Sequence, residues 1–246
     1  MKNYKKNLKT LQDGHVYSKE MEHDACGVGL IASTEGKKSR KVVEYGINAL
    51  KAVWHRGAVD ADGKTGDGAG IHLEIPSNFF AEKIDLTGHK HDDSEICVGM
   101  IFLPRNNYAA QENSRTLVES ELTKSNFSIY GWRQVPVNPK VLGEKANFTR
   151  PEITQVLIKN NNKNLIGKDL ERKIYESRRK IEKEAIKNSI DGFYICSLSS
   201  KSIIYKGMFL AESIADFYVD LKDERFTSRT TKQNSPDKNE YQKVEL

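Results

Sequence analysis

The sequence predicts an α+β protein, in which short buried strands are interspersed with amphipathic helices. Uncharged apolar runs such as Ile96–Leu103 are typical of buried strands, whereas Asp169–Asn188 repeats its apolar residues at helical spacing. With 37% hydrophobic and 30% charged residues the composition is that of a soluble globular protein. No apolar run is long enough to cross a bilayer, so we expect no membrane partner.

The first element is a polar leader over residues 1–25, which shows no helical or strand periodicity. Its lysines are not followed by an apolar stretch, which excludes a secretory signal. Acidic residues such as Glu20 and Asp24 argue against a transit peptide. We therefore expect a cytoplasmic protein with a flexible leader.

A strand and a helix follow the leader. Gly27–Ala32 is apolar and uncharged, which predicts a strand. Ser39 is a suitable N-cap for a helix that ends near Gly57, a residue suited to the left-handed conformation at helix ends. The residues predicted to share the buried face of this helix are Val43, Ile47, Leu50 and Trp54.

The remaining elements follow a loop over Asp60–Gly70, whose glycines permit backbone conformations closed to other residues. Strands are predicted over Ile71–Ile75, Ile96–Leu103, Ser128–Val135, Thr154–Lys159, Phe193–Leu198 and Ile203–Tyr205. Helices are predicted after Pro76, over Ala109–Thr123 and Asp169–Asn188, and around Ile214–Leu221. From Arg229 the large apolar residues are few and scattered, which predicts a disordered tail over residues 229–246.

Charge and cysteine content exclude several kinds of site. The net charge of +5 comes from basic residues interspersed with nearly as many acids, without the basic and aromatic cluster of an RNA-binding module, so we expect no nucleic-acid partner. The three cysteines are too far apart for a zinc site and too few for a disulfide scaffold. Cys97 and Cys196 lie in predicted buried strands, where a thiol acts as a small apolar group.

Cys26 differs from these two because it stands at the start of a strand, after a polar segment and beside Gly27. If the chain were cut after Ala25, the free amine of Cys26 could accept the proton of its own thiol, since an α-amine has a pKa of about 7.7–8.0. The thiolate could then attack a carboxamide, and Gly27 and Gly29 would leave room for substrate because neither carries a side chain. On residue type alone, a Cys-Gly pair at the start of a strand is more often structural than catalytic.

The motifs around Cys26 resemble those of a known family. Cys26–Ala32, His55-Arg56-Gly57-Ala58 and Asp62–Gly70 are similar, in that order, to the start of the glutamate synthase large subunit. Later segments that continue the resemblance include Val98–Leu103, Gly131–Pro136, Phe193–Ser199 and Phe217–Leu221. The family segment is a class II glutamine amidotransferase domain of the N-terminal-nucleophile type, and the resemblance covers residues 22–228.

The resemblance implies a fold and a site. The fold is a four-layer αββα sandwich, incomplete here at its C-terminal side, with a domain over residues 26–228 and a propeptide over residues 1–25. Cys26 would be the catalytic nucleophile, and glutamine the substrate. Arg56 would bind substrate near the nucleophile, although it could instead be a surface arginine at a helix end. Gly66, Asp67 and Gly68 would belong to an active-site loop, although Asp67 could instead stabilise the turn.

The sequence also departs from the family. The family's His-Gln-Arg-Phe-Ser-Thr-Asn and His-Asn-Gly-Glu-Ile-Asn motifs, which supply the substrate arginine and the oxyanion hole, are absent. We therefore expect an inactive isolated chain that depends on the remainder of glutamate synthase, and the alternatives are a non-catalytic interaction module or an amidotransferase serving another acceptor. FMN and the iron–sulfur cluster belong to later domains of the family, so no cofactor is expected here.

Overall fold

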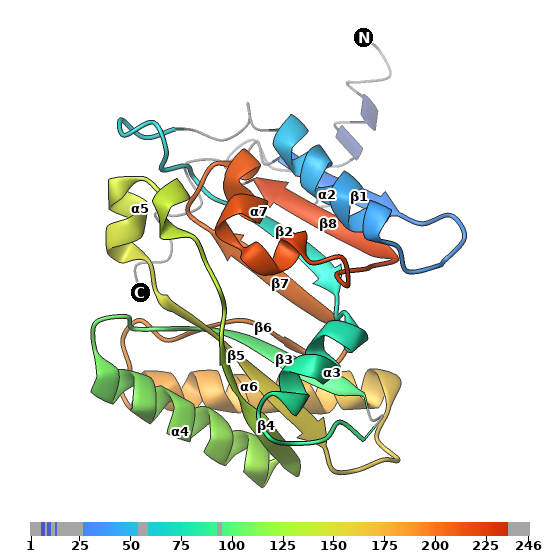
Figure 1. The fold of residues 1–246 in the computed structure, drawn as a ribbon, viewed down its shortest axis with the longest axis vertical. Coiled ribbons are helices and arrows are strands. Elements are labelled where there is room, and N and C mark those ends of the chain that lie inside the picture. The colour runs from blue at the N-terminus through green and yellow to red at the C-terminus, as the bar shows by residue number, and fades with distance from the viewer. Residues whose placement is uncertain are drawn as a thin grey trace.

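A computed structural model describes residues 27–53, 59–92 and 95–235, together with isolated residues between 6 and 13. It contains two four-stranded antiparallel sheets, with strand orders β1-β8-β2-β7 and β4-β5-β3-β6 (Figure 1). The strands are β1 (Gly27–Ala32), β2 (Ala69–Glu74), β3 (Ile96–Leu103), β4 (Phe127–Gln134), β5 (Glu152–Asn160), β6 (Tyr194–Ser199), β7 (Ser202–Gly207) and β8 (Thr230–Ser235). The α+β prediction is confirmed.

The helices follow the predicted amphipathic segments closely. They are α2 (Arg40–Ala52), α3 (Ser77–Asp85), α4 (Tyr108–Lys124), α5 (Glu144–Thr149), α6 (Gly167–Lys187) and α7 (Ile214–Phe217), with 3₁₀ turns η2 (Pro139–Val141), η3 (Ala211–Ser213) and η4 (Val219–Lys222). The side chain of Ser39 caps α2 by accepting a hydrogen bond from the Lys41 amide. The single helix predicted around Ile214–Leu221 is instead divided between η3, α7 and η4.

The second sheet and its two helices form a compact unit inserted between β2 and β7. Apart from η2 and α5, which lie between β4 and β5, its strands and helices follow in the order β3-α4-β4-β5-α6-β6. In the sheet, β5 lies between β3 and β4, and β3 lies between β5 and β6. This antiparallel β-α-β-β-α-β arrangement is the split βαβ, or ferredoxin-like, topology. Apolar residues of α4, α6 and one sheet face share a core, which includes Val118, Ile174 and Val156.

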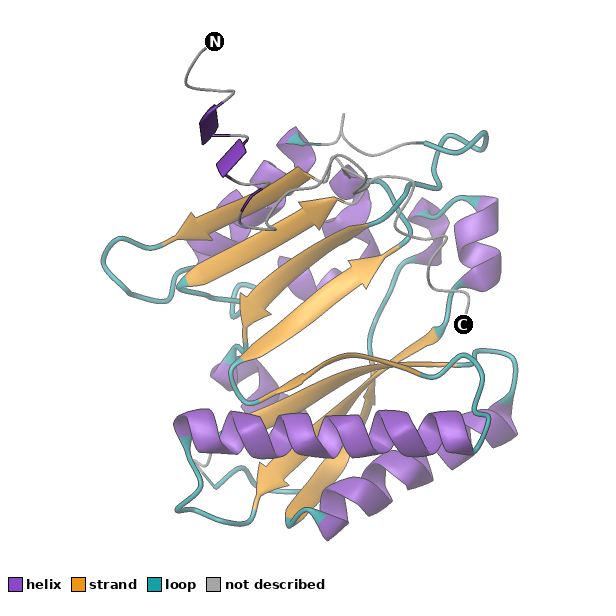
Figure 2. Cartoon of the chain, turned by 180° about the vertical axis from the view of Figure 1, so that it is seen from behind, coloured by secondary structure: helices purple, strands orange, loops and turns teal. Residues whose placement is uncertain are grey.

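A second core joins this inserted unit to the first sheet. It includes Ile71 and Tyr205 on the first sheet, Met100 on the other, and the aromatic rings of Phe79 and Phe226 between them. The two sheets meet along β6 and β7, which the short Ser199–Ser202 connection joins. Helices α2 and α7 lie on one face of the first sheet, and Figure 2 shows that the described helices leave its other face uncovered.

Strand β8 corrects the sequence analysis. Residues from Arg229 on were expected to be disordered, yet Thr230–Ser235 pair with both β1 and β2 in the interior of the first sheet. Thr231 and Gln233 are buried against α2, where Gly46 leaves space for them. Low apolar content did not prevent ordering here because two neighbouring strands supply backbone hydrogen-bond partners. The rest of the predicted tail, residues 236–246, lies outside the described residues.

No described helix is both long and apolar enough to span a membrane. The leader over residues 1–25 lies almost wholly outside the described residues. The burial predicted for Cys97 and Cys196 is confirmed, since their exposed fractions are 0% and 4%.

Candidate active site

The two residues on which the sequence analysis depended most, Cys26 and Arg56, lie outside the described residues. Their neighbours are described: Gly27 begins β1, and α2 ends at Ala52, followed by Val53. The described residues nearest to them in the sequence belong to the end of the first sheet and to the loop over residues 59–68.

The sheet register brings the start of β1 and the start of β2 to the same end of the first sheet. Gly27 is paired with Ser235 and Gly70 with Asn234, which are consecutive residues of β8. Since adjacent strands lie 4.7–4.9 Å apart, β1 and β2 are about 10 Å apart across β8. The residue bonded to Cys26 thus shares a sheet end with the loop that carries Gly66, Asp67 and Gly68.

This loop is a tight turn held by one aspartate. The carboxylate of Asp62 accepts hydrogen bonds from the amides of Lys64 (2.9 Å) and Thr65 (2.7 Å) and from the Thr65 hydroxyl (2.6 Å). The Thr65 hydroxyl bond, followed by the two amide bonds, lowers the pKa of Asp62 to about 2. Gly63 occupies the left-handed region with φ +68°, which explains a glycine there.

Helix α5, which the sequence analysis missed, supports the turn from outside. The amide of Ala146 donates to the Thr65 hydroxyl at 3.4 Å, and Lys145 forms an ion pair with Asp60 at 3.0 Å. The amide of Ala61, followed by Lys145, lowers the pKa of Asp60. At Gly143, an added Cβ would lie 2.1 Å from a carboxylate oxygen of Asp62, so only glycine allows this approach.

The three loop residues that the sequence analysis named, Gly66, Asp67 and Gly68, lie within the described part of the chain and differ in exposure. Gly66 and Gly68 are buried, and Asp67 is half-buried. A Cβ at Gly66 would lie 3.0 Å from the backbone of Phe209, so the glycine allows the loop to approach the segment after β7. Asp67 also borders a cavity of about 430 Å³ that is open to solvent between the loop, Lys145 and Met208.

Sequence reasoning missed the residues that shape the loop, Asp62 and Thr65. The Asp62-Gly63-Lys64-Thr65 sequence carries a usable signal, since an aspartate often bonds amides two and three residues on in turns that precede glycine-rich segments. The support from α5 has no such local signal, because Gly143 and Ala146 lie far away in the sequence.

We expect the order of this loop to depend on pH through Asp62. Its pKa in the folded protein is about 2, below the ordinary 3.8, so the carboxylate stabilises the turn above about pH 4 and this contribution is lost as the pH falls towards 2. NMR titration of the Asp62 carboxyl and hydrogen exchange of the Thr65 amide would measure it. The variant Asp62→Asn should abolish this pH dependence of the amide, whereas a carboxyl midpoint near pH 4 would contradict the hydrogen-bonded turn.

Metal chemistry receives no support from clustered side chains. Within residues 27–53, 59–92 and 95–235, no group of three or more His, Cys, Asp or Glu side chains could hold a metal ion. Cys97 and Cys196 are also poor nucleophiles, since burial raises the pKa of the Cys196 thiol to about 12 and that of Cys97 further.

Comparison with known proteins identifies the family. Residues 26–232 match the sequence profile of the family described as glutamine amidotransferases class-II. The chain is 55% identical to the glutamate synthase [NADPH] large chain of Azospirillum brasilense, over 92% of this chain and 15% of that protein. It is 40% identical to the ferredoxin-dependent glutamate synthase of Pyropia yezoensis, over 85% of this chain and 14% of that protein.

A third relative, the glutamate synthase [NADPH] large chain of Bacillus subtilis, is 36% identical over 87% of this chain and 14% of that protein. The chain thus spans about 15% of the length of the curated relatives that it matches. The family match begins at the cysteine that the sequence analysis selected and ends inside β8. The chain belongs to the class II glutamine amidotransferase family.

Proposed function

We propose that this chain is the glutaminase domain of a glutamate synthase, which hydrolyses glutamine to glutamate and ammonia for glutamate biosynthesis. The observation that carries the proposal is the family match over residues 26–232, which starts at Cys26. The relatives named glutamate synthase support the assignment within the family. The remainder of such an enzyme would be the partner that uses the ammonia.

The proposed reaction starts with removal of residues 1–25, which leaves Cys26 with a free α-amine. This amine takes the thiol proton, and the thiolate attacks the carboxamide carbon of glutamine. Ammonia leaves as the thioester forms, and water then hydrolyses the thioester to glutamate. Arg56 would bind the substrate, and Gly66, Asp67 and Gly68 would line the site.

The chemistry of this route needs no metal or cofactor, since the cysteine itself forms the covalent intermediate. FMN and an iron–sulfur cluster would belong to other domains of a glutamate synthase. The buried state of Cys97 and Cys196 supports the choice of Cys26, because a thiol with a strongly raised pKa supplies little thiolate at neutral pH.

We also propose that the complete domain is the four-layer αββα sandwich of the N-terminal-nucleophile type. The uncovered face of the first sheet supports this proposal, because Val28 and Leu30 are 70% and 61% exposed on adjacent outward positions of β1. A sheet packed on this face would bury both side chains. The sequence analysis ended the domain at residue 228. We propose that the domain extends at least to Ser235, because β8 is part of its first sheet.

The experiment is intact-mass spectrometry of the full chain, followed by labelling with a diazo-ketone analogue of glutamine. A catalytic chain predicts a product that begins at Cys26 and carries one label there, whereas the inactivity expected from the missing motifs predicts neither. Cys26→Ala should abolish the labelling, whereas the matched control Cys196→Ala should retain it because that thiol is buried. Absence of both leader removal and label would refute activity of this polypeptide.

A second candidate is a non-catalytic fragment or interaction module that keeps the first part of the fold. The absence of the substrate-arginine and oxyanion-hole motifs from the sequence favours it. Among the described residues, the buried Gln233 Oε1 has no hydrogen-bond partner, so the packing around β8 is not fully satisfied there. Glutamate release from glutamine decides between the two, since the fragment would show no turnover even with Cys26 at its N-terminus. If the whole protein releases glutamate from glutamine but does not transfer the ammonia to 2-oxoglutarate, an amidotransferase that serves another acceptor is favoured.

A further inference from the structure

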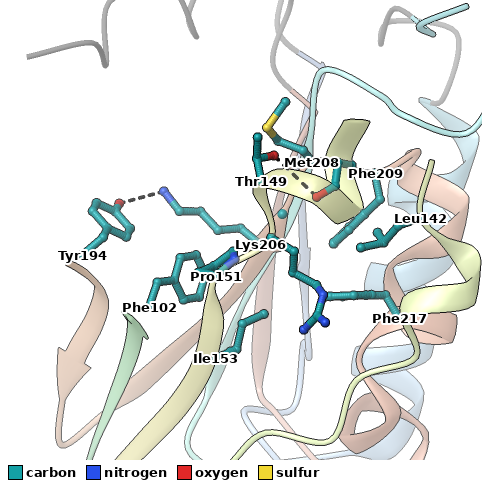
Figure 3. Close-up of a pocket in the computed structure, with 13 residues that line it drawn as sticks. Phe102, Leu142, Thr149, Pro151, Ile153, Tyr194, Lys206, Met208, Phe209 and Phe217 are labelled. Carbon is teal, nitrogen blue, oxygen red and sulfur yellow. Dashed lines mark hydrogen bonds between the residues drawn. The ribbon is translucent and has the colours of Figure 1, made fainter. Parts of the chain in front are cut away.

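A cavity of about 310 Å³ lies where the end of β7 meets α5 and the ends of β3 and β5 (Figure 3). Most of its wall is apolar: Phe102, Leu142, Ile153, Phe209 and Phe217 line it. A concave, apolar cavity of this size is typical of sites for small molecules. It lies at β7, which is the edge of the first sheet opposite β1.

Two cationic side chains also line this cavity, Arg150 and Lys206. The Lys206 ammonium donates a hydrogen bond to the Tyr194 hydroxyl at 2.7 Å and lies 4.5 Å from the centre of the Tyr194 ring. Arg150 donates from Nε to the Asn147 side chain at 3.3 Å. In the part of the chain that the structure describes, neither cation forms an ion pair with a carboxylate.

A third cation increases the positive charge. Arg105 donates to the backbone oxygens of Asn147 (2.9 Å) and Phe148 (3.4 Å), at the C-terminal end of α5. Burial, followed by the charge of Arg105, lowers the pKa of Arg150. The charge of Glu152 acts on this pKa in the opposite direction, but no ion pair joins Glu152 to Arg150 in the described part of the chain, so an anion in the cavity would be attracted to Arg150.

We propose that this cavity binds a small amphipathic carboxylate, with its apolar body against Phe102, Phe209 and Phe217 and its carboxylate on Arg150, where the charge of Lys206 in the same cavity wall adds to the attraction. The proposal follows from complementarity: the walls exclude a wholly polar ligand, and the two unpaired cations favour an anion over a neutral molecule. Guanidinium and ammonium groups are the usual partners of a carboxylate in proteins.

Such a ligand would contact elements that hold the candidate active-site loop. Ala146 lines the cavity, and its amide bonds the Thr65 hydroxyl of the loop. Met208 borders both this cavity and the smaller one beside Asp60 and Asp67. Binding needs neither Cys26 nor leader removal, so its failure would leave the proposed function untouched.

Isothermal titration of the full chain with 4-phenylbutyrate, and with the neutral 4-phenylbutanol, tests the proposal. We expect the carboxylate to bind at least about tenfold more tightly than the alcohol, since one charge-assisted hydrogen bond is worth about that factor. Arg150→Gln should lower the affinity for 4-phenylbutyrate roughly tenfold and leave that for 4-phenylbutanol unchanged. Lys206→Gln should act in the same direction, which keeps the test available if Arg150→Gln does not fold.

The matched control is Arg172→Gln, which removes an exposed cation on α6, away from the cavity. It should leave both affinities unchanged. Equal affinity of the two probes would overturn the proposal. So would retention of 4-phenylbutyrate binding in both cavity variants, or an equal loss in the Arg172→Gln control.

Discussion

Replacing Asp220 with alanine should lower the free energy of unfolding by about 3–5 kcal/mol, the cost of leaving a buried charge without its partner. Asp220 receives two hydrogen bonds from the Arg133 guanidinium, at 2.7 and 2.6 Å. The exposed fractions of the two side chains are 4% and 14%, so water cannot replace the lost carboxylate. Urea denaturation followed by circular dichroism would measure the loss.

The effect should be large because the pair belongs to a network between the two sheets. Arg133 on β4 also donates to Gln155 on β5 at 2.8 Å, and Gln155 donates to the Tyr205 hydroxyl on β7 at 3.2 Å. Tyr205 in turn donates to Asp220 at 3.3 Å. Burial, followed by the charge of Asp220, raises the pKa of Tyr205 well above its ordinary value, which keeps the hydroxyl a donor.

The matched control for Asp220→Ala is Asp216→Ala, which breaks an ion pair of similar length with Lys222. Both side chains of this control pair are more than half exposed, so the change should stay within about 1 kcal/mol. Replacing both members of the buried pair, as Arg133→Met with Asp220→Leu, should cost less than Asp220→Ala, because no unpaired charge remains. A loss below about 1 kcal/mol in Asp220→Ala would show that the pair does not hold the sheets together.

Replacing Gly46 with leucine should destabilise the protein by about 3 kcal/mol, although leucine is the better helix former. Gly46 lies on the buried face of α2, and a Cβ there would lie 2.4 Å from the Thr231 hydroxyl oxygen and 2.9 Å from the Thr231 Cβ. The backbone oxygen of Gly46 also accepts a hydrogen bond from the Gln233 side chain at 3.0 Å. A larger side chain must displace β8 from α2.

Two further variants separate packing from helix propensity. Gly46→Ala should still destabilise, by about 1–2 kcal/mol, whereas on an exposed face it would stabilise by nearly 1 kcal/mol. Asn48→Ala, at an exposed position of the same helix, should stabilise by a few tenths of a kcal/mol. Urea midpoints of the three variants would show the order. A stabilised Gly46→Ala would mean that β8 does not pack against α2 in solution.

The sequence predicted the elements with clear local periodicity because that signal comes from neighbouring residues. The strand Gly27–Ala32 matches β1, and the helices at Ala109–Thr123 and Asp169–Asn188 match α4 and α6 within two residues. The resemblance, which covers residues 22–228, names the same family as the comparison, whose match covers residues 26–232. The site assignments of Cys26 and Arg56 stay predictions, because these residues lie outside the described part of the chain.

Strand β8 shows where local reasoning failed. Thr230–Ser235 is polar enough to predict disorder, but its backbone pairs with β1 on one side and β2 on the other. The pairing of β8 depends on the register between residues more than a hundred positions apart. A short polar segment carries no local signal of such a pairing.

The sequence by itself determined the family, the α+β class, the buried state of Cys97 and Cys196, and the choice of Cys26 as the candidate nucleophile. Only the tertiary structure decided which distant groups meet: Arg133 and Asp220 are 87 residues apart, and Ala146 lies 81 residues from the turn it supports. The physical reason is that periodicity and turn chemistry act over a few residues, whereas burial and charge pairing are set by the packing of whole sheets. For Cys26, the structure adds the shared sheet end of Gly27 and the Gly66–Gly68 loop, which no local pattern contains.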